Sequence, residues 1–199
     1  MARKVGLDRR QVIDAAAALA DAEGLASVTL ARVAAALGVA SPSLYSHIDS
    51  LAALHRELAL DASARLGADV RDAIADVRGG SVGTGGEAAL RRVAHAYRAF
   101  AHAHPGLYAT LHTTPGRGQD AELSAAFEAL VVDLAAVLTA LGLPQDDVVP
   151  LIRTLRSGLH GFVSLEASGG FGLPQDVDAS FETLIDVLVA GVLSRRGRG

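Results

Sequence analysis

The most restrictive feature of this sequence is a pair of helical patterns joined by a very short turn, within residues 29–48. Thr29 can cap a first helix, because a threonine hydroxyl accepts a free N–H at a helix N-terminus. Apolar residues then follow at i, i+3, i+4 and i+7 spacing, at Leu30, Val33, Ala34 and Leu37. Gly38 can end this helix, since glycine adopts a positive φ at little cost. Ser41 can cap a second helix, with Pro42 at its first position.

The packing of these two helices predicts which side chains stay exposed. Ala34 is small enough for the two backbones to approach each other. Val39, Leu44 and Ile48 then pack the second helix onto the first. The residues left facing outward are Ser41, Pro42, Tyr45, Ser46 and His47. A helix N-terminus of this kind fits the major groove of DNA, whereas the alternative is a structural hairpin with an accidental Tyr and His.

The rest of the chain also follows helical patterns, so we predict an all-α fold. Further helices are expected at residues 9–23, 51–77, 87–103, 105–113, 120–141, 145–167 and 178–195. The glycine-rich residues 79–86 form the clearest flexible connection. Half of the residues are hydrophobic and only 4% are aromatic, so the core is expected to be mainly aliphatic.

Composition and charge exclude several classes of protein. The absence of Cys excludes disulfides, thiolate catalysis and Cys-ligated zinc. We find no apolar run long enough to span a bilayer and no signal peptide, so a cytoplasmic protein is expected. The net charge of −4 does not itself indicate a nucleic-acid binder. Arg3 and Lys4 nevertheless belong to a basic N-terminal segment that can lie along a phosphate backbone or simply be solvated.

Two motifs resemble the N-terminal domain of the TetR family of bacterial transcriptional regulators. The first runs from Thr29 through Val33-Ala34 to Leu37-Gly38-Val39, and the second from Leu44-Tyr45 through His47-Ile48 to Ser50. The match covers about residues 9–58, and the all-helical remainder is also similar to that family. The resemblance implies an N-terminal three-helix helix-turn-helix domain, residues 1–50, and a larger ligand-binding and dimerisation domain, residues 51–199, with residues 51–77 as the connecting helix.

The resemblance also assigns roles to individual residues. It implies that Thr29, Tyr45 and His47 contact backbone phosphates and that Ser46 reaches a base edge. Ser41, Pro42 and Ser43 would begin the recognition helix. The family often has Lys where this chain has Leu51, and many members carry a cation on the recognition helix. We therefore expect a shallow salt dependence that relies on Arg3, Lys4, Arg9 and Arg32. Loss of DNA binding is an alternative consequence of these departures.

Two apolar stripes near the C-terminus suggest a dimer interface. One stripe is Val148, Leu151, Ile152, Leu155, Leu159 and Phe162, and the other is Phe181, Leu184, Ile185, Leu188, Val189 and Val192. Two such helices from each of two chains can form a four-helix bundle. We therefore predict a homodimer through residues 145–167 and 178–195. The alternative is that both stripes face the core of their own domain.

Residues 155–174 are similar to the C-terminal domain of a TetR subgroup named for a Trp-His-Gly motif, with Leu159 in place of Trp. Gly158 and Gly161 lie inside the expected helix, where each costs roughly 1 kcal/mol relative to Ala. Close helix packing or room for a ligand can offset that cost, and we favour packing. His160 would then be a hydrogen-bonded core or interface residue rather than a ligand contact.

Candidate ligand contacts follow from the resemblance, which implies a small-molecule cavity in the C-terminal domain. They are Tyr97, Phe100, Tyr108, Phe127, Arg153, His160 and Phe162, although plain core packing is an alternative for each. Four histidines, His95, His102, His104 and His112, lack the spacing of a metal site. No catalytic motif is present, so we expect neither an enzyme nor a cofactor. An all-α hydrolase or metal protein that uses the histidines is the rival class.

These observations together predict a DNA-binding transcriptional regulator. We expect a ligand-responsive repressor that binds a palindromic operator as a homodimer. Double-stranded DNA and an unidentified small-molecule effector are its expected partners, and no membrane is expected.

Overall fold

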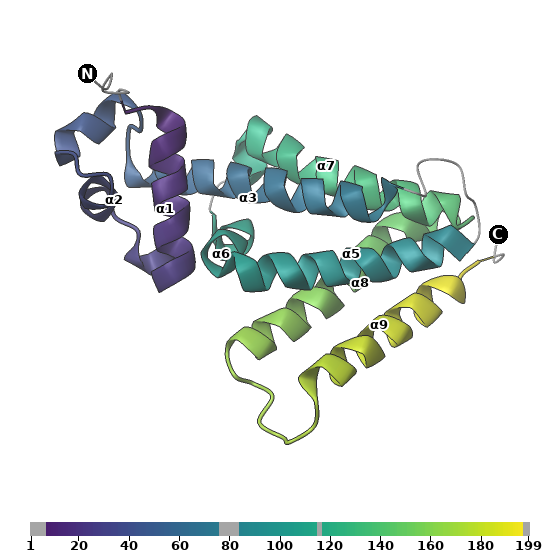
Figure 1. Cartoon of the computed structure of the whole chain (residues 1–199). Coiled ribbons are helices and arrows are strands. Elements are labelled where there is room, and N and C mark those ends of the chain that lie inside the picture. The colour runs from purple at the N-terminus through teal and green to yellow at the C-terminus, as the bar shows by residue number, and fades with distance from the viewer. Residues whose placement is uncertain (1–6, 76–83, 115–116, 197–199) are drawn as a thin grey trace. The chain divides into compact units, whose positions relative to one another are not determined.

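The computed structural model describes residues 7–75, 84–114 and 117–196, and within these ranges the regular structure is helical throughout (Figure 1). The all-α prediction is therefore confirmed. The chain divides into two compact units. The first contains residues Met1–Arg65 and Ala103–Ala126, and the second contains Leu66–His102 and Phe127–Gly199. Arg3 and Lys4 lie outside the described residues.

The first unit holds the predicted helix-turn-helix. Its elements are α1 (Arg9–Glu23), η1 (Leu25–Ser27), α2 (Leu30–Ala36), η2 (Ser41–Ser46), the start of α3 (Leu51–Ala73), α6 (Pro105–Thr113), η3 (Arg117–Gln119) and the start of α7 (Ala121–Ala140). The caps that Thr29 and Gly38 are predicted to provide are confirmed, and Ser50 caps α3 in the same way as Thr29 caps α2. The Thr29 hydroxyl accepts the Arg32 N–H, the Ser50 hydroxyl accepts the Ala53 N–H at 3.0 Å, and Gly38 has a φ of 66°.

The second helix of the motif differs from the prediction at its start. Ser41 does not cap it, because Ala40 precedes the helix, Ser41 is its first residue and no side chain caps it. The segment is a six-residue 3₁₀ helix. Such short helices use tight i→i+3 bonds, and the Ser46 hydroxyl makes a side-chain bond of the same spacing to the Ser43 carbonyl at 2.9 Å.

Helices α1 and α6 approach each other very closely within the first unit. A Cβ atom on Gly106 would lie 2.2 Å from the carbonyl carbon of Ala20, a distance that no real side chain tolerates. One residue along α1, Asp21 accepts the backbone N–H groups of Gly106 at 2.9 Å and Leu107 at 3.0 Å. Its other oxygen lies 2.9 Å from His104 Nδ1. Asp21 therefore caps the N-terminus of α6.

The second unit contains α5 (Thr84–Ala103) up to His102, most of α7, α8 (Gln145–Ala167) and α9 (Val177–Leu193). Most residues of the two C-terminal stripes are buried inside this unit: Val148, Ile152, Leu155, Leu159, Phe181, Ile185, Val189 and Val192. The burial of these eight residues supports the alternative that the stripes face the core of their own domain, and dimerisation through residues 145–167 and 178–195 stays a prediction. Gly158 shows the same packing, since a Cβ atom there would lie 3.1 Å from Leu188.

The expectation that no apolar run is long enough to span a bilayer is wrong for helix α7. Ala121–Ala140 is long and apolar enough to span a membrane by length and composition, with a mean hydropathy of 1.8. Only 22% of that apolar window is buried. A single helix of this kind is weak support for a membrane segment, because helices of water-soluble proteins pass the same test.

Candidate nucleic-acid interface

The exposed side of η2 is the candidate surface for DNA. Leu44 on its inner side is buried, as are Ile48, two residues after η2, and Val33 and Ala34 of α2. This burial fixes the direction of η2 and leaves Tyr45 56% exposed. A large aromatic side chain with a hydroxyl is thus held on the surface beside short polar residues, an arrangement suited to groove edges and phosphates.

The structure places the other predicted DNA contacts in two classes of exposure. Thr29, Pro42, Ser43 and Ser46 are exposed, whereas Ser41 and His47 are half-buried. Thr29 uses a lone pair of its hydroxyl oxygen to accept the Arg32 N–H at 3.2 Å. Its O–H therefore remains available as a donor to a phosphate oxygen.

Arg32, a further predicted DNA contact, is engaged within the chain. Its guanidinium donates to both carboxylate oxygens of Glu23, at 2.6 and 2.7 Å, and to the Ser27 carbonyl at 3.3 Å. A bidentate pair of this kind holds the side chain in one orientation. Arg32 can contact a phosphate only if its guanidinium leaves Glu23 or bonds to both groups at once. The sequence did not predict this ion pair.

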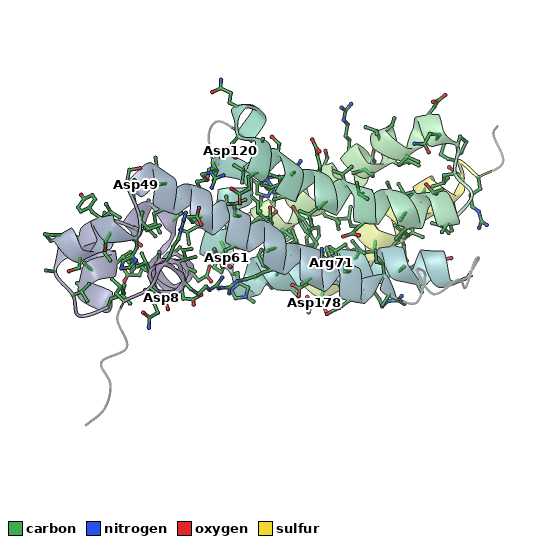
Figure 2. The ribbon with its side chains drawn as sticks, turned by 90° about the horizontal axis from the view of Figure 1, so that it is seen from above. Asp8, Asp49, Asp61, Arg71, Asp120 and Asp178 are labelled. Carbon is green, nitrogen blue, oxygen red and sulfur yellow. The ribbon has the colours of Figure 1, made fainter. Side chains whose placement is uncertain are left out.

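The basic residues at the start of α1 are also paired with acids. Arg9 lies 2.7 Å from Glu57, and Arg10 donates to Asp14 and to Asp61, which lies on α3 (Figure 2). Hydrogen bonds to Asp14 and Asp61 raise the pKa of Arg10 above its usual value. These cations hold α1 against α3 and are only partly available to DNA.

The predicted ligand contacts differ widely in their surroundings. Phe100 and Tyr108 are buried, whereas Tyr97, Phe127, His160 and Phe162 are half-buried and Arg153 is exposed. Burial, and to a smaller extent the charge of Arg156, lowers the pKa of His160.

Aromatic packing accounts for the position of Phe162. Its ring lies 4.7 Å from that of Phe171 and 5.1 Å from that of Phe181. The Arg98 guanidinium lies 4.6 Å from the centre of the Phe181 ring and forms ion pairs with Glu166 and Asp178, whose position on α9 is labelled in Figure 2. This cluster joins α5, α8 and α9 of the second unit.

Three of the four clustered histidines face single carboxylates rather than one another. His95 lies 3.3 Å from Glu182, His102 lies 2.8 Å from Glu166, and His104 lies 2.9 Å from Asp21. Across the described ranges, no group of three or more His, Cys, Asp or Glu residues is arranged to hold a metal ion.

Comparisons with known proteins agree with this arrangement. Residues 12–58 match the model of the bacterial regulatory proteins of the tetR family, and residues 90–188 match a tetracyclin repressor-like C-terminal domain. The chain is 33% identical to the uncharacterized HTH-type transcriptional regulator Rv0681 of Mycobacterium tuberculosis, over 100% of this chain and 88% of that protein.

Solved structures show the same fold. A protein of unknown function from Rhodococcus sp. RHA1 superposes with a TM-score of 0.77 at 22% identity, covering 94% of this chain and 96% of the other. A TetR from Acinetobacter baumannii AYE, solved in complex with minocycline, has a TM-score of 0.68 at 25% identity, with coverage of 96% and 99%.

A helix-turn-helix with an exposed recognition surface and a separate helical unit defines a DNA-binding transcriptional regulator rather than an enzyme. The chain belongs to the TetR family of bacterial transcriptional regulators. Members of this family bind DNA as dimers and respond to small-molecule effectors.

Proposed function

We propose that this chain is a ligand-responsive repressor that binds a palindromic operator as a homodimer in the cytoplasm. The observation that carries the DNA-binding part is the exposure of Tyr45 on a helix fixed by buried Leu44 and Ile48. Two copies of η2, one from each chain, would enter successive major grooves about one helical turn apart.

Each predicted contact has a role in this proposal. Tyr45, His47 and Thr29 donate hydrogen bonds to phosphate oxygens, and Ser46 reaches a base edge. Ser41, Pro42 and Ser43 present the first turn of η2 to the groove. Arg3, Lys4 and Arg32 supply the cationic contacts. Since Arg32 is already paired with Glu23, fewer counterions are released on binding and the salt dependence is shallow.

The outward faces of α8 and α9 are the proposed dimer surface, in place of the buried stripes. One line of exposed residues on each helix is uncharged: Thr154, Ser157 and Leu165 on α8, and Thr183, Val187, Ala190 and Ser194 on α9. Val187, in the middle of α9, is 65% exposed and would be covered in such a dimer.

Two glycines on these helices support the dimer proposal. A Cβ atom on Gly161 or on Gly191 would meet nothing within 4 Å in this chain. Glycine inside a helix costs roughly 1 kcal/mol relative to alanine, and no close approach within the described chain requires it at either position. Close approach of a second copy would explain both residues, because helices cross most closely where side chains are smallest.

The effector would act by changing the spacing of the two recognition helices. Tyr97, Phe100, Tyr108, Phe127, Arg153, His160 and Phe162 are the proposed contacts, and the division into residues 1–50 and 51–199 is part of the same proposal. To move operator occupancy from nearly full to nearly empty, the effector must favour the DNA-incompetent state by about 5 kcal/mol.

Fluorescence anisotropy tests the DNA-binding part. The wild type and a Tyr45→Ala/His47→Ala variant are titrated, across a salt series, into duplex from the region upstream of the gene and into an unrelated duplex. We expect tight, salt-dependent binding to the first duplex alone and its loss in the variant. Leu173→Ala, at an exposed loop position of the second unit, is the control and should bind like the wild type.

Two further measurements keep this test interpretable. Because His47 is half-buried, circular dichroism must show that the double variant is folded, and Tyr45→Phe isolates the hydroxyl from the ring. If no duplex from the upstream region or from a random-sequence selection binds, the DNA-binding proposal is rejected.

A further inference from the structure

The hydroxyl of Ser46 already uses its hydrogen within the chain. Its O–H donates to the Ser43 carbonyl oxygen at 2.9 Å, and the direction is certain because a carbonyl oxygen only accepts. Ser46 is exposed on η2, and its hydroxyl oxygen accepts no hydrogen bond within the described ranges. A hydroxyl oxygen carries two acceptor lone pairs. Ser46 therefore presents an acceptor, rather than a donor, to whatever binds this surface.

The 3₁₀ geometry of η2 favours this bond. Residues i and i+3 of such a helix lie on one line along its axis, and Ser43 and Ser46 have this spacing within η2. Serine hydroxyls often bond to a backbone carbonyl three or four residues earlier. To donate elsewhere, Ser46 would have to give up the bond, whereas accepting a bond leaves it in place. Donation also strengthens the oxygen as an acceptor, because linked hydrogen bonds polarise one another.

The opposite arrangement at Thr29 shows why the direction of the bond matters. The Thr29 oxygen accepts the Arg32 N–H, which leaves its O–H free to donate. Phosphate oxygens only accept, so a hydroxyl such as that of Thr29 suits the DNA backbone. The Ser46 hydroxyl has no free hydrogen for a phosphate. If Ser46 hydrogen bonds directly to DNA, its partner is therefore a base.

The major groove contains only two kinds of hydrogen-bond donor. These are the N6 amino group of adenine and the N4 amino group of cytosine. Guanine presents N7 and O6, and thymine presents O4, all of which are acceptors. An acceptor on the protein can therefore bond to adenine or cytosine but not to guanine or thymine. Because the Ser46 O–H cannot also donate to adenine N7, this contact does not favour adenine over cytosine.

We propose that Ser46 is a specificity-determining residue that selects adenine or cytosine, over guanine or thymine, on the DNA strand that it faces. This inference rests on the proposed contact of Ser46 with a base edge. Since each chain of the dimer would contribute one Ser46, the preference should recur symmetrically in the two half-sites. One neutral hydrogen bond corresponds to a preference of roughly three- to tenfold in each half-site.

Selection from random-sequence duplexes tests the preference. The full-length wild type, Ser46→Ala and Ser43→Ala are each used, and circular dichroism confirms that the variants are folded. We expect the wild type to select adenine or cytosine at one position of each half-site, and Ser46→Ala to lose this preference but keep the others. Ser43→Ala is the matched control and should keep it, because the variant loses an exposed hydroxyl of η2 but retains the backbone carbonyl to which Ser46 donates.

Base analogues then isolate the amino group. At the selected position of one half-site, purine replaces adenine, or 2-pyrimidinone replaces cytosine, and fluorescence anisotropy measures the loss of affinity. The weaker base pairing affects both proteins equally, so the additional loss in the wild type relative to Ser46→Ala measures the contact. We expect this additional loss to be roughly three- to tenfold.

The possible failures are distinguishable. If the wild type and Ser46→Ala select the same bases, or lose equal affinity with the analogue, the role of Ser46 is overturned while DNA binding stands. Selection of guanine or thymine at the position that Ser46→Ala alters also overturns it. If the wild type selects no duplex at all, the DNA-binding proposal is rejected, and the role of Ser46 with it.

Discussion

Asp21 and Gly106 are 85 positions apart in sequence, yet the Asp21 carboxylate accepts the Gly106 backbone N–H at 2.9 Å. The same oxygen also accepts the Leu107 N–H. A residue of α1 thus performs for α6 the role that a residue adjacent in sequence usually performs for its own helix. The contact ties a helix that packs on α2 to a helix contributed by a later part of the chain.

Removal of this long-range cap should destabilise the protein. We expect Asp21→Ala to lower the free energy of unfolding by about 1–2 kcal/mol, because two N–H groups lose their acceptor. Urea denaturation followed by circular dichroism measures the loss. Asp8→Ala is the matched comparison, because it removes a local cap instead of a long-range one. Asp8 accepts the Gln11 N–H of its own helix α1 at 2.8 Å. If Asp21→Ala costs no more than a few tenths of a kcal/mol, the cap is not a structural link.

The close approach of α1 and α6 gives a second stability prediction. Gly106→Ala should destabilise the protein by about 1–3 kcal/mol, because the new Cβ would overlap the backbone of Ala20 and the helices must separate. Gly118→Ala is the control, since a Cβ at Gly118 meets nothing within 4 Å. Thermal denaturation of both variants checks the prediction. An equal effect of the two substitutions would contradict the close packing.

The helix-turn-helix was predictable because its determinants are local. The Thr29 cap, the positive φ of Gly38 and the burial of Leu44 each depend on neighbours within a few residues, so spacing alone indicates them. The 3₁₀ geometry of η2 was not predicted, because the same residues are compatible with a short α-helix.

Long-range relationships were not predictable in the same way. Periodicity indicated the apolar stripes of α8 and α9, but a stripe does not reveal whether its own chain or a second chain covers it. Val148 and Phe181 are in fact covered by their own unit. The pairing of Arg32 with Glu23 and the cap from Asp21 to α6 depend on tertiary structure, which no local pattern encodes.

Release of Arg32 should strengthen DNA binding at low salt. Glu23→Gln removes the carboxylate charge that holds this guanidinium, so the side chain becomes free to reach a phosphate. We expect the slope of log affinity against log salt to steepen by about 1, as for one additional phosphate contact. Anisotropy titrations at several salt concentrations measure the slope. Glu128→Gln, an exposed carboxylate of the second unit, provides the comparison and should leave it unchanged.

Asp120 should make folding stability depend on acid pH. Hydrogen bonds from Arg56 lower the pKa of Asp120 to about 2, below the value of about 3.9 in an unfolded chain. The depressed pKa contributes stability that is present above the unfolded value and is lost as the pH falls toward the folded value. We therefore expect Asp120→Asn to lose less stability than the wild type between about pH 4 and pH 2.

Urea denaturation at a series of pH values measures this effect. Asparagine also caps helices, so the N-terminal cap of α7 that Asp120 provides to the Leu123 N–H is retained in the variant. Asp49→Asn, at an exposed position just before α3, is the control and should follow the wild-type profile. If the free energy of unfolding falls equally with pH in the wild type and in Asp120→Asn, the ion pair with Arg56 does not lower the pKa of Asp120.

Substitutions at Gly161 and Gly191 can distinguish an effect on dimerisation from an effect on the stability of the monomer. Gly161→Leu and Gly191→Leu should each leave the monomer as stable as before or more stable, because leucine favours helix and a Cβ atom at either position meets no other part of the described chain within 4 Å. In the proposed dimer the same side chains would hold α8 and α9 of two copies apart, so we expect monomers in sedimentation velocity and loss of tight operator binding. Gly118→Leu should remain dimeric. Dimers that persist in both helix variants would exclude these faces and require a different surface.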